Sequence, residues 1–249
     1  MRKYVQRLAN LVFRFLMFLL LDHEVEGVGN IPAEGPVITA QNHMISVDTV
    51  IAAAYIDREA VGMSKVENYE FLPLAVLFKL YGTFPVRRGE VDRTALRTAL
   101  RVLKEGKVLM AAPEGTRSKT NNLQRGKDGL TYIAIRSGAS VVPVAIWGQE
   151  KFWEQLKRLR RTKVKMVMGK PFIFEPGEGK LTREQLSQMT DEMMYRLAAL
   201  MPPEYRGYYN DLSAATEEYL RPYDGSHSRT VGRGAKRRRI IFSKGDVSG

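Results

Sequence analysis

The stretch PVITAQNHMISVDTVIAAAYI, residues 36–56, indicates the fold more clearly than any other part of the chain. Its first part, PVITAQN (36–42), is the short apolar run that a buried strand requires. The part that follows is apolar and rich in alanine, which predicts a turn and then a helix beginning near Ser46. A strand that leads through a turn into a helix is the repeating unit of a sheet covered by helices. His43 lies at the junction of the two elements.

The same alternation continues along the chain. Further candidate strands are HEVEGV (23–28), AVGMSK (60–65), GTFPV (82–86), KVLMAAP (107–113), SVVPVAI (140–146) and KVKMVMG (163–169). Leucines at helical spacing predict a helix over residues 91–106, and a second helix is predicted from about Thr182 to Leu200. These elements predict an α/β fold in which a central mixed sheet of about seven strands is flanked by helices.

Composition divides the chain into four parts, the first of which is a membrane-anchoring helix over residues 1–22. With 249 residues, of which 44% are hydrophobic, the chain can bury the core of one α/β domain. We therefore predict a single catalytic domain over residues 23–203, followed by a tyrosine-rich C-terminal helical segment over 204–224. In residues 225–249, glycine, serine and the run GRGAKRRR replace periodic apolar residues, which predicts a basic, disordered tail.

The N-terminal segment is predicted to form an amphipathic helix associated with a membrane. Its polar residues recur at the spacing of one helical stripe, namely Lys3, Arg7, Asn10 and Arg14. The uncharged run 15–21 is far shorter than the roughly 20 residues that span a bilayer, so the helix is expected to lie in the interface. A buried core helix is the alternative. A signal peptide is disfavoured, because LDHEVEG follows where small residues should mark a cleavage site.

The charge balance predicts an anionic partner. The formal net charge is +12 and the isoelectric point is near 9.9, which suits a nucleic acid, an anionic lipid surface or a phosphorylated substrate. The basic tract KFWEQLKRLRRTKVK (151–165) is expected to meet anionic lipid headgroups, and a solvated surface is the alternative. The absence of cysteine excludes disulfides, thiolate nucleophiles and cysteine metal sites.

His43 and Asp48 form a candidate catalytic pair. The chain has only three histidines, so few residues can perform imidazole chemistry. Within one regular helix, five steps of about 100° would place the two side chains roughly 140° apart. The pair can therefore interact only if His43 lies in the turn and Asp48 in the first turns of the helix. In that geometry the carboxylate would fix the imidazole tautomer, and the ring could act as a general base toward a hydroxyl.

Two further segments suit an anionic ligand. In AAPEGTRS (111–118), backbone amides near Gly115, the hydroxyl of Thr116 and the guanidinium of Arg117 match a phosphate, and they stand beside Glu114. In GTFPVRRG (82–89), a pair of arginines leaves a short apolar strand. A charged turn and a solvent-facing arginine pair are the alternatives.

Together these segments resemble the glycerolipid acyltransferase family, whose best-known members acylate lysophosphatidate to phosphatidate. Four motifs in order carry the resemblance, which covers about residues 23–170: NHMISVD (42–48), GTFPVRRG (82–89), PEGTRS (113–118) and VVPVAI (141–146). The resemblance implies that His43 is the base, that Asp48 is its partner, and that Pro143 is structural or lines the acyl site. It further implies an acceptor-phosphate site formed by Arg88, Glu114, Gly115, Thr116 and Arg117.

The resemblance also implies the reaction. An acyl group would pass from acyl-CoA or acyl-acyl carrier protein to the free hydroxyl of lysophosphatidate, in phospholipid biosynthesis. With such a donor, the basic tract 151–165 is a candidate docking site for an acidic acyl carrier protein, because its lysines and arginines lie beside Phe152 and Trp153. Glycerol 3-phosphate or another lysolipid is the alternative acceptor. We expect no bound cofactor, no metal and no nucleic acid, and a peripheral or monotopic position on the cytoplasmic face of a membrane. A basic nucleic-acid-binding protein is a remote alternative, and a hydrolase is disfavoured because the chain has no Gly-x-Ser-x-Gly elbow.

Overall fold

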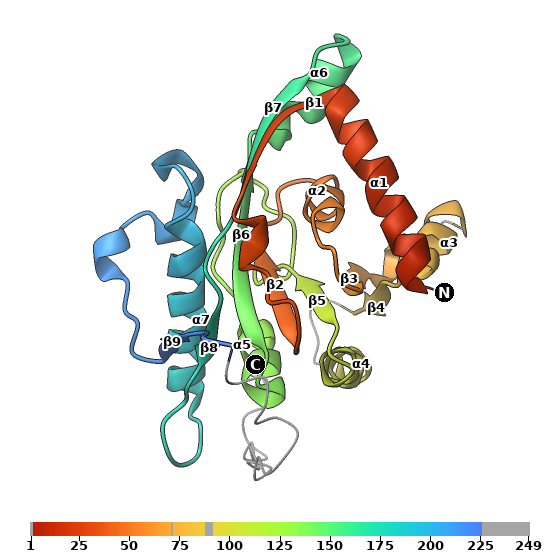
Figure 1. Ribbon diagram of the computed structural model, residues 1–249. Helices are drawn as coiled ribbons and strands as arrows, with labels where there is room; N and C mark the ends of the chain where they lie inside the picture. Colours follow the sequence, from red (N-terminus) through yellow and green to blue (C-terminus); the bar gives the residue numbers. More distant parts are fainter. Residues whose placement is uncertain (1, 71, 88–91, 226–249) are drawn as a thin grey trace.

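The computed structural model describes residues 2–70, 72–87 and 92–225. Figure 1 shows a twisted sheet with helices on both faces, which confirms the predicted α/β class. Of the predicted tail, residues 225–249, only residue 225 is among the described residues. Arg88 is not among them either.

One mixed sheet of nine strands forms the centre of the molecule. Its strands are β1 (Leu21–Glu26), β2 (Val37–Gln41), β3 (Ala60–Lys65), β4 (Phe84–Val86), β5 (Val108–Ala111), β6 (Ser140–Trp147), β7 (Thr162–Met168), β8 (Phe172–Phe174) and β9 (Leu220–Pro222). The order is β1-β7-β6-β2-β5-β3-β4, and β8 pairs with β6 and β9. The seven predicted strands are all present. The sequence analysis missed β8 and β9, which have three residues each.

Seven α-helices are described. They are α1 (Arg2–Leu20), α2 (Asp48–Ala54), α3 (Leu72–Tyr81), α4 (Arg93–Lys104), α5 (Asp128–Ser137), α6 (Phe152–Lys157) and α7 (Arg183–Ala198). The two helices predicted with explicit bounds are confirmed as α4 and α7. Each begins at a side-chain cap, because Asp92 accepts the amides of Thr94 and Ala95, and Thr182 and Gln185 form a capping box.

Two cores lie on opposite faces of the sheet. One core joins β2, β5, β6 and β7 to α1 and α2, and the other joins the sheet to α4, α5 and α7. Successive residues of β5 alternate between them, with Val108 and Met110 in the first core and Leu109 and Ala111 in the second. The central strands are therefore apolar throughout because both faces are covered.

The C-terminal segment corrects one prediction. Instead of one helix, residues after 202 form three short 3-10 turns, Pro203–Tyr205, Gly207–Tyr209 and Leu212–Ala214, and then β9. The burial of one side chain and the backbone conformation of one glycine explain why these residues do not form a single helix. Tyr209 is fully buried, and Gly207 has a φ of 51° at a point where a Cβ would collide with the carbonyl of Leu123. Packing against the rest of the domain therefore determines the conformation of this segment.

The N-terminal helix is present, but its polar stripe faces the protein. The side-chain amide of Gln6 donates to the carbonyls of Ala60 and Tyr81, and that of Asn10 donates to the carbonyl of Ile56. Further along α1, Arg14 Nε donates to the carbonyl of Ala54 at 2.6 Å. The carbonyls of Ala54 and Ile56 lie at and just beyond the end of α2, and that of Tyr81 lies at the end of α3, where a helix leaves its last carbonyls unpaired.

The opposite face of α1 is apolar and exposed. Its exposed residues are Tyr4, Val5, Leu8, Leu11, Val12, Phe15, Leu16, Phe18 and Leu19. Arg7 lies outside the buried polar stripe and is exposed, contrary to the predicted grouping with Asn10 and Arg14. Within the described residues, no helix has the length and apolarity needed to cross a bilayer.

Candidate active site

The predicted site residues that the structure describes gather at one edge of the sheet. β2 and β5 are parallel neighbours, so their carboxyl ends meet at the same edge. His43 follows β2 and Glu114 follows β5. In sheets of this type, ligands bind beyond the carboxyl ends of the strands. The arrangement therefore brings two motifs that are far apart in the sequence to one place.

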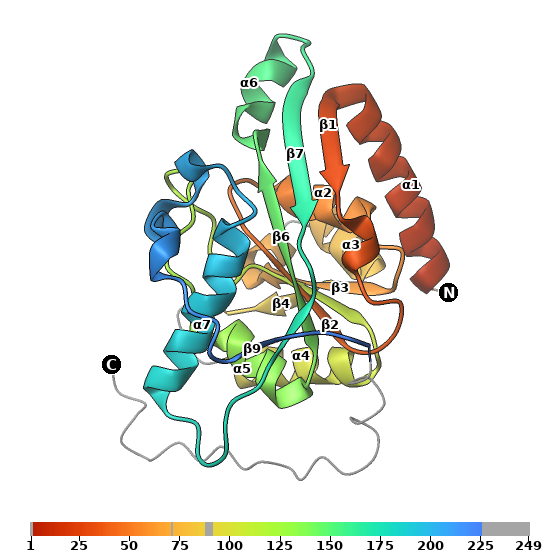
Figure 2. The same cartoon turned by 60° about the vertical axis from the view of Figure 1, so that its left-hand side comes forward.

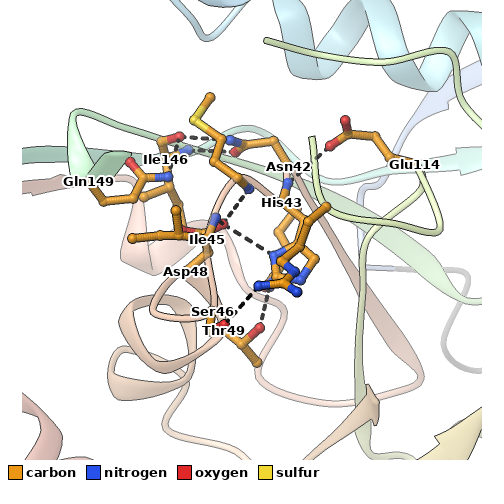
Figure 3. A network of polar contacts seen from close by, with 12 residues as sticks. Asn42, His43, Ile45, Ser46, Asp48, Thr49, Glu114, Ile146 and Gln149 are labelled. Carbon is orange, nitrogen blue, oxygen red and sulfur yellow. Dashed lines mark hydrogen bonds and ion pairs between the residues drawn. The ribbon is translucent and has the colours of Figure 1, made fainter. Parts of the chain in front are cut away.

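His43 and Asp48 interact across the start of α2, as the spacing predicted. His43 Nδ1 lies 3.2 Å from Asp48 Oδ2 (Figure 3). The aspartate side chain is fully buried, while the imidazole remains 15% exposed. Because the buried carboxylate contacts Nδ1, the Nε2 side of the ring is the one that can serve a substrate.

Asp48 also holds the turn that carries the histidine. Its Oδ2 atom accepts the main-chain amides of Met44, at 2.6 Å, and Ile45, at 2.9 Å. One carboxylate oxygen thus fixes the backbone of the turn and the orientation of the ring together. Ser46 does not cap the helix, because the N-cap residue is Val47 and makes no side-chain capping bond. The hydroxyl of Ser46 instead accepts from Arg117 Nη1 at 3.4 Å.

Glu114 connects the two loops. It is 2% exposed, its Oε1 accepts the main-chain amide of His43 at 3.0 Å, and its Oε2 accepts the main-chain amide of Gln124 at 3.0 Å. Burial raises the pKa of this carboxyl, and the amide bonds partly oppose that rise. The amide of Ser118 donates back to the carbonyl of His43 at 2.7 Å. The carboxylate oxygens are therefore engaged by loop amides, which differs from the predicted contact with a phosphate.

Two cationic side chains, Arg117 and Lys127, lie at the Glu-Gly-Thr-Arg turn. Arg117 is exposed and reaches Ser46, three residues after His43. Gly115 has a φ of 67°, and a Cβ at this position would lie 3.0 Å from Cδ of Lys127 and 3.6 Å from its ammonium nitrogen. The lysine side chain therefore lies over the Glu-Gly-Thr-Arg turn. Thr116 is half-buried in the same turn.

Lys127 and Asn42 were missed by the sequence analysis. The amide of Lys127 donates to the carbonyl of Pro113 at 2.8 Å, which fixes the residue next to the motif although it is distant from it in the sequence. The side-chain amide of Asn42 donates to the carbonyl of Ile146 at 2.7 Å, and its Oδ1 accepts the main-chain amide of Ile146 at 2.7 Å (Figure 3). These two hydrogen bonds join the end of β2 to β6. The position of Asn42 directly before His43 was a usable signal, whereas nothing local marks Lys127.

Arg87, the first arginine of GTFPVRRG, lies at the same edge of the sheet. β4 is parallel to β3, and β3 is parallel to β5, so the carboxyl ends of all three strands coincide. Arg87 follows β4, and Asp92 Oδ2 accepts its amide at 3.0 Å. Two strand spacings of about 4.8 Å separate β4 from β5. Arg88 itself lies outside the described residues, so its predicted role stays a prediction.

Comparison with known proteins identifies the family. The family model described as Acyltransferase matches residues 22–147, which include His43, Asp48 and the whole Glu-Gly-Thr-Arg turn. The chain belongs to the acyltransferase family.

Several members of this family resemble the chain closely enough to compare. A 1-acyl-sn-glycerol-3-phosphate acyltransferase of Bacillus subtilis is 27% identical over 69% of this chain and 84% of its own length. The chloroplastic LPAT1 of Arabidopsis thaliana, which carries the same enzyme name, is 25% identical over 77% of this chain, which spans 55% of that relative. The crystal structure of the 1-acyl-sn-glycerophosphate acyltransferase PlsC from Thermotoga maritima superimposes with a TM-score of 0.61 at 25% identity, covering 86% of this chain and 82% of that one.

Proposed function

We propose that this acyltransferase transfers a fatty acyl group to the free hydroxyl of lysophosphatidate and so forms phosphatidate. The observation that carries the proposal is the contact between His43 and Asp48 across the start of α2, beside a turn that presents Arg117. The names of the Bacillus and Thermotoga relatives support lysophosphatidate as the acceptor. Glycerol 3-phosphate and other lysolipids remain the alternative acceptors.

The geometry of the imidazole supports direct transfer of the acyl group. The acceptor hydroxyl attacks the thioester carbonyl while His43 Nε2 removes its proton. Because an alcohol is far less acidic than an imidazolium, proton transfer accompanies the attack. The tetrahedral intermediate then collapses, the ester remains, and the thiolate leaves and takes the proton back from the imidazolium. Asp48 stabilises the cation in between, and no covalent acyl-enzyme is needed.

The acceptor is held by its phosphate. Arg117 and Lys127 supply positive charge at the turn that contains Gly115, and we retain Thr116 and Arg88 as further phosphate ligands. Glu114 acts on this site through the loop amides that it binds. Anchoring the phosphate fixes the hydroxyl near His43, and positioning of this kind can contribute several kcal/mol to a transition state.

The donor is acyl-CoA or acyl-acyl carrier protein, acting as a substrate without a bound cofactor. The catalytic roles in this proposal require no metal, and among the described residues no three acidic, histidine or cysteine side chains are grouped to hold one. The apolar face of α1 would lie on a membrane, where a lysolipid acceptor is found. We place the enzyme peripherally on the cytoplasmic face, the side on which a water-soluble acyl carrier is available.

Thiol release tests the proposal directly. The detergent-purified protein is given acyl-CoA or acyl-acyl carrier protein together with lysophosphatidate, glycerol 3-phosphate or another lysolipid, and free thiol is followed over time. The chain contains no cysteine, so the enzyme contributes no thiol background. We expect release with lysophosphatidate and its loss in His43→Ala. The proposal would be refuted if none of the acceptors supports thiol release, or if wild type and His43→Ala release thiol at equal rates.

A further inference from the structure

The connection between β6 and β7 ends in a tip with an unusual residue at its apex. We define the α6 tip as residues 152–161, which comprise α6 and the turn after it. Leu159 in this turn is 93% exposed and has a φ of 53°. Its amide donates to the carbonyl of Leu156, and that of Arg160 donates to the carbonyl of Gln155. These two bonds define a helix-ending motif whose left-handed position is normally occupied by glycine.

A leucine at this position is costly in two ways. The left-handed conformation is strained for a residue with a Cβ, and an almost fully exposed leucine leaves its apolar surface in water. Glycine would avoid both costs without changing the turn. Strain that the fold does not require points to a function for the side chain.

Trp153 and the basic residues of the tip complete an amphipathic surface. Trp153 is 56% exposed, and its ring packs edge-on against the buried ring of Phe152 at 5.0 Å, which anchors it to the core. Lys157 and Arg160 are exposed beside Leu159. Exposed tryptophan and leucine next to lysine and arginine are the residues that interfacial membrane segments use.

The tip is continuous with the exposed face of α1. Figure 1 shows α6 and its turn at the same end of the molecule as the C-terminal end of α1, and Figure 2 shows β7 and β1 between the two helices. Arg161 bridges the two elements, because its guanidinium donates to the carbonyl of Leu21 and lies 5.7 Å from the ring centre of Phe18. Phe18 belongs to the apolar face of α1. Arg161 therefore connects the apolar face of α1 to the α6 tip, and it lies two residues after Leu159.

We propose that the α6 tip is a second membrane-contacting element, which inserts Leu159 and Trp153 into an anionic bilayer next to α1 while Lys157 and Arg160 bind lipid headgroups. The proposal rests on the membrane location in the proposed function and adds a defined contact to it. Charge complementarity and continuity with α1 favour a lipid surface as the occupant. An acidic acyl carrier protein would use the cations but would leave the strained leucine unexplained.

Tryptophan fluorescence reports insertion without any use of activity. Trp147 and Trp153 are the only two tryptophans, so Trp147→Phe leaves Trp153 as the sole reporter. The reporter protein, which also carries His43→Ala, is titrated with vesicles of phosphatidylcholine alone or mixed with phosphatidylglycerol. We expect a blue shift of Trp153 and its quenching by brominated acyl chains in the anionic vesicles. An unshifted, unquenched Trp153 on protein that sediments with vesicles would overturn the proposal, whether or not the enzyme transfers acyl groups.

Leu159→Gly separates insertion from stability. Glycine should leave thermal stability equal or higher, because it relieves the left-handed strain. We expect this variant to partition about tenfold more weakly into anionic vesicles, because an inserted leucine side chain is lost. A variant that is as stable as wild type and binds vesicles equally would show that Leu159 does not insert.

Charge reversal with a matched control tests the headgroup contacts. Lys157→Glu with Arg160→Glu should weaken binding to anionic vesicles at least about 30-fold, and the loss should shrink at high salt. Lys180→Glu with Arg183→Glu changes the net charge equally at the opposite end of the molecule, near the start of α7, and should bind like wild type (Figure 1). Equal losses for both pairs would reduce the effect to net charge. Unchanged vesicle binding with slower transfer from acyl carrier protein in detergent would assign the tip to that protein and overturn the proposal.

Discussion

The carboxylate of Glu114 binds the backbone of His43, with Oε1 accepting the histidine main-chain amide at 3.0 Å. The other carboxylate oxygen binds the amide of Gln124. The motif after β5 therefore supports the motif after β2 from inside the protein, while Arg117 reaches the same turn from outside. The proposed function thus assigns positioning of the base and recognition of an anion to neighbouring residues of one turn.

Replacing Glu114 by glutamine should separate positioning from binding. Glutamine has one acceptor oxygen, so it can bind only one of the two loop amides, and we expect kcat to fall about 10–100-fold with little change in the KM for the acceptor.

Burial raises the pKa of Glu114 in the folded state. Its contribution to stability is therefore full below the unfolded value of 4.5 and is lost as the pH rises through the folded pKa. Urea unfolding should accordingly show the stability of wild type relative to Glu114→Gln decreasing with pH. In the kinetic measurement on Glu114→Gln, a rise in the KM for the acceptor without a fall in kcat would contradict the positioning role of Glu114.

Asp48→Asn should keep the turn but lose the catalytic pair. The asparagine oxygen can still accept the amides of Met44 and Ile45, whereas the charge that supports the imidazolium is gone. We expect kcat to fall on the order of 10³-fold with a native circular dichroism spectrum. Asp57→Asn, at the exposed ion pair with Arg14, is the matched control and should be near wild type. Similar losses in both variants would argue against the pair.

Arg117→Ala and Lys127→Ala should each raise the KM for lysophosphatidate, by about tenfold, because a charge-assisted contact to the phosphate is lost. The effect on the KM for the acyl donor should be small. Lys119→Ala removes an exposed cation from the same loop and serves as the control. If Lys127→Ala matches Lys119→Ala in steady-state kinetics, then Lys127 only packs on Gly115.

Asn10→Leu should destabilise the fold although it makes α1 more apolar. The change removes the donor to the carbonyl of Ile56 and the acceptor of the Tyr81 hydroxyl, both of which are buried. Leaving such groups unpaired costs about 1–3 kcal/mol each. Arg7→Leu, at an exposed position of the same helix, should change the free energy of unfolding in detergent far less. Equal stability of the two variants would mean that α1 is not docked by its polar stripe.

Asp92 makes α4 sensitive to acid. Its carboxylate accepts the amides of Arg87, Thr94 and Ala95, and these bonds, chiefly the one from Arg87, lower the pKa of Asp92 below 3.8. The stability it contributes is therefore present above 3.8 and is lost as the pH falls through the lowered value. Asp92→Ala should cost about 1 kcal/mol near neutral pH in urea unfolding, and the difference from wild type should vanish in acid. A difference that persists in strong acid would contradict this assignment.

Much of the fold could be predicted because it depends on short-range patterns. Seven strands and the helices over 93–104 and 183–198 follow from apolar runs, leucine spacing and caps that are local in the sequence. The pairing of His43 with Asp48 was also predictable, since five residues separate them and only a helix start brings them together. The strands β8 and β9 were not predictable, because three residues carry no period and their pairing depends on distant strands.

By itself, the sequence determined the α/β class, the order of the motifs and the contact between His43 and Asp48 across a helix start. Only the tertiary structure decided that Glu114 binds loop amides, that Lys127 covers Gly115 and that Gln6 and Asn10 face inward. The physical reason is one of range. A helical period or an apolar run limits the conformation of neighbouring residues, whereas a buried hydrogen bond depends on which distant backbone group the packed sheet brings within 3 Å of a side chain.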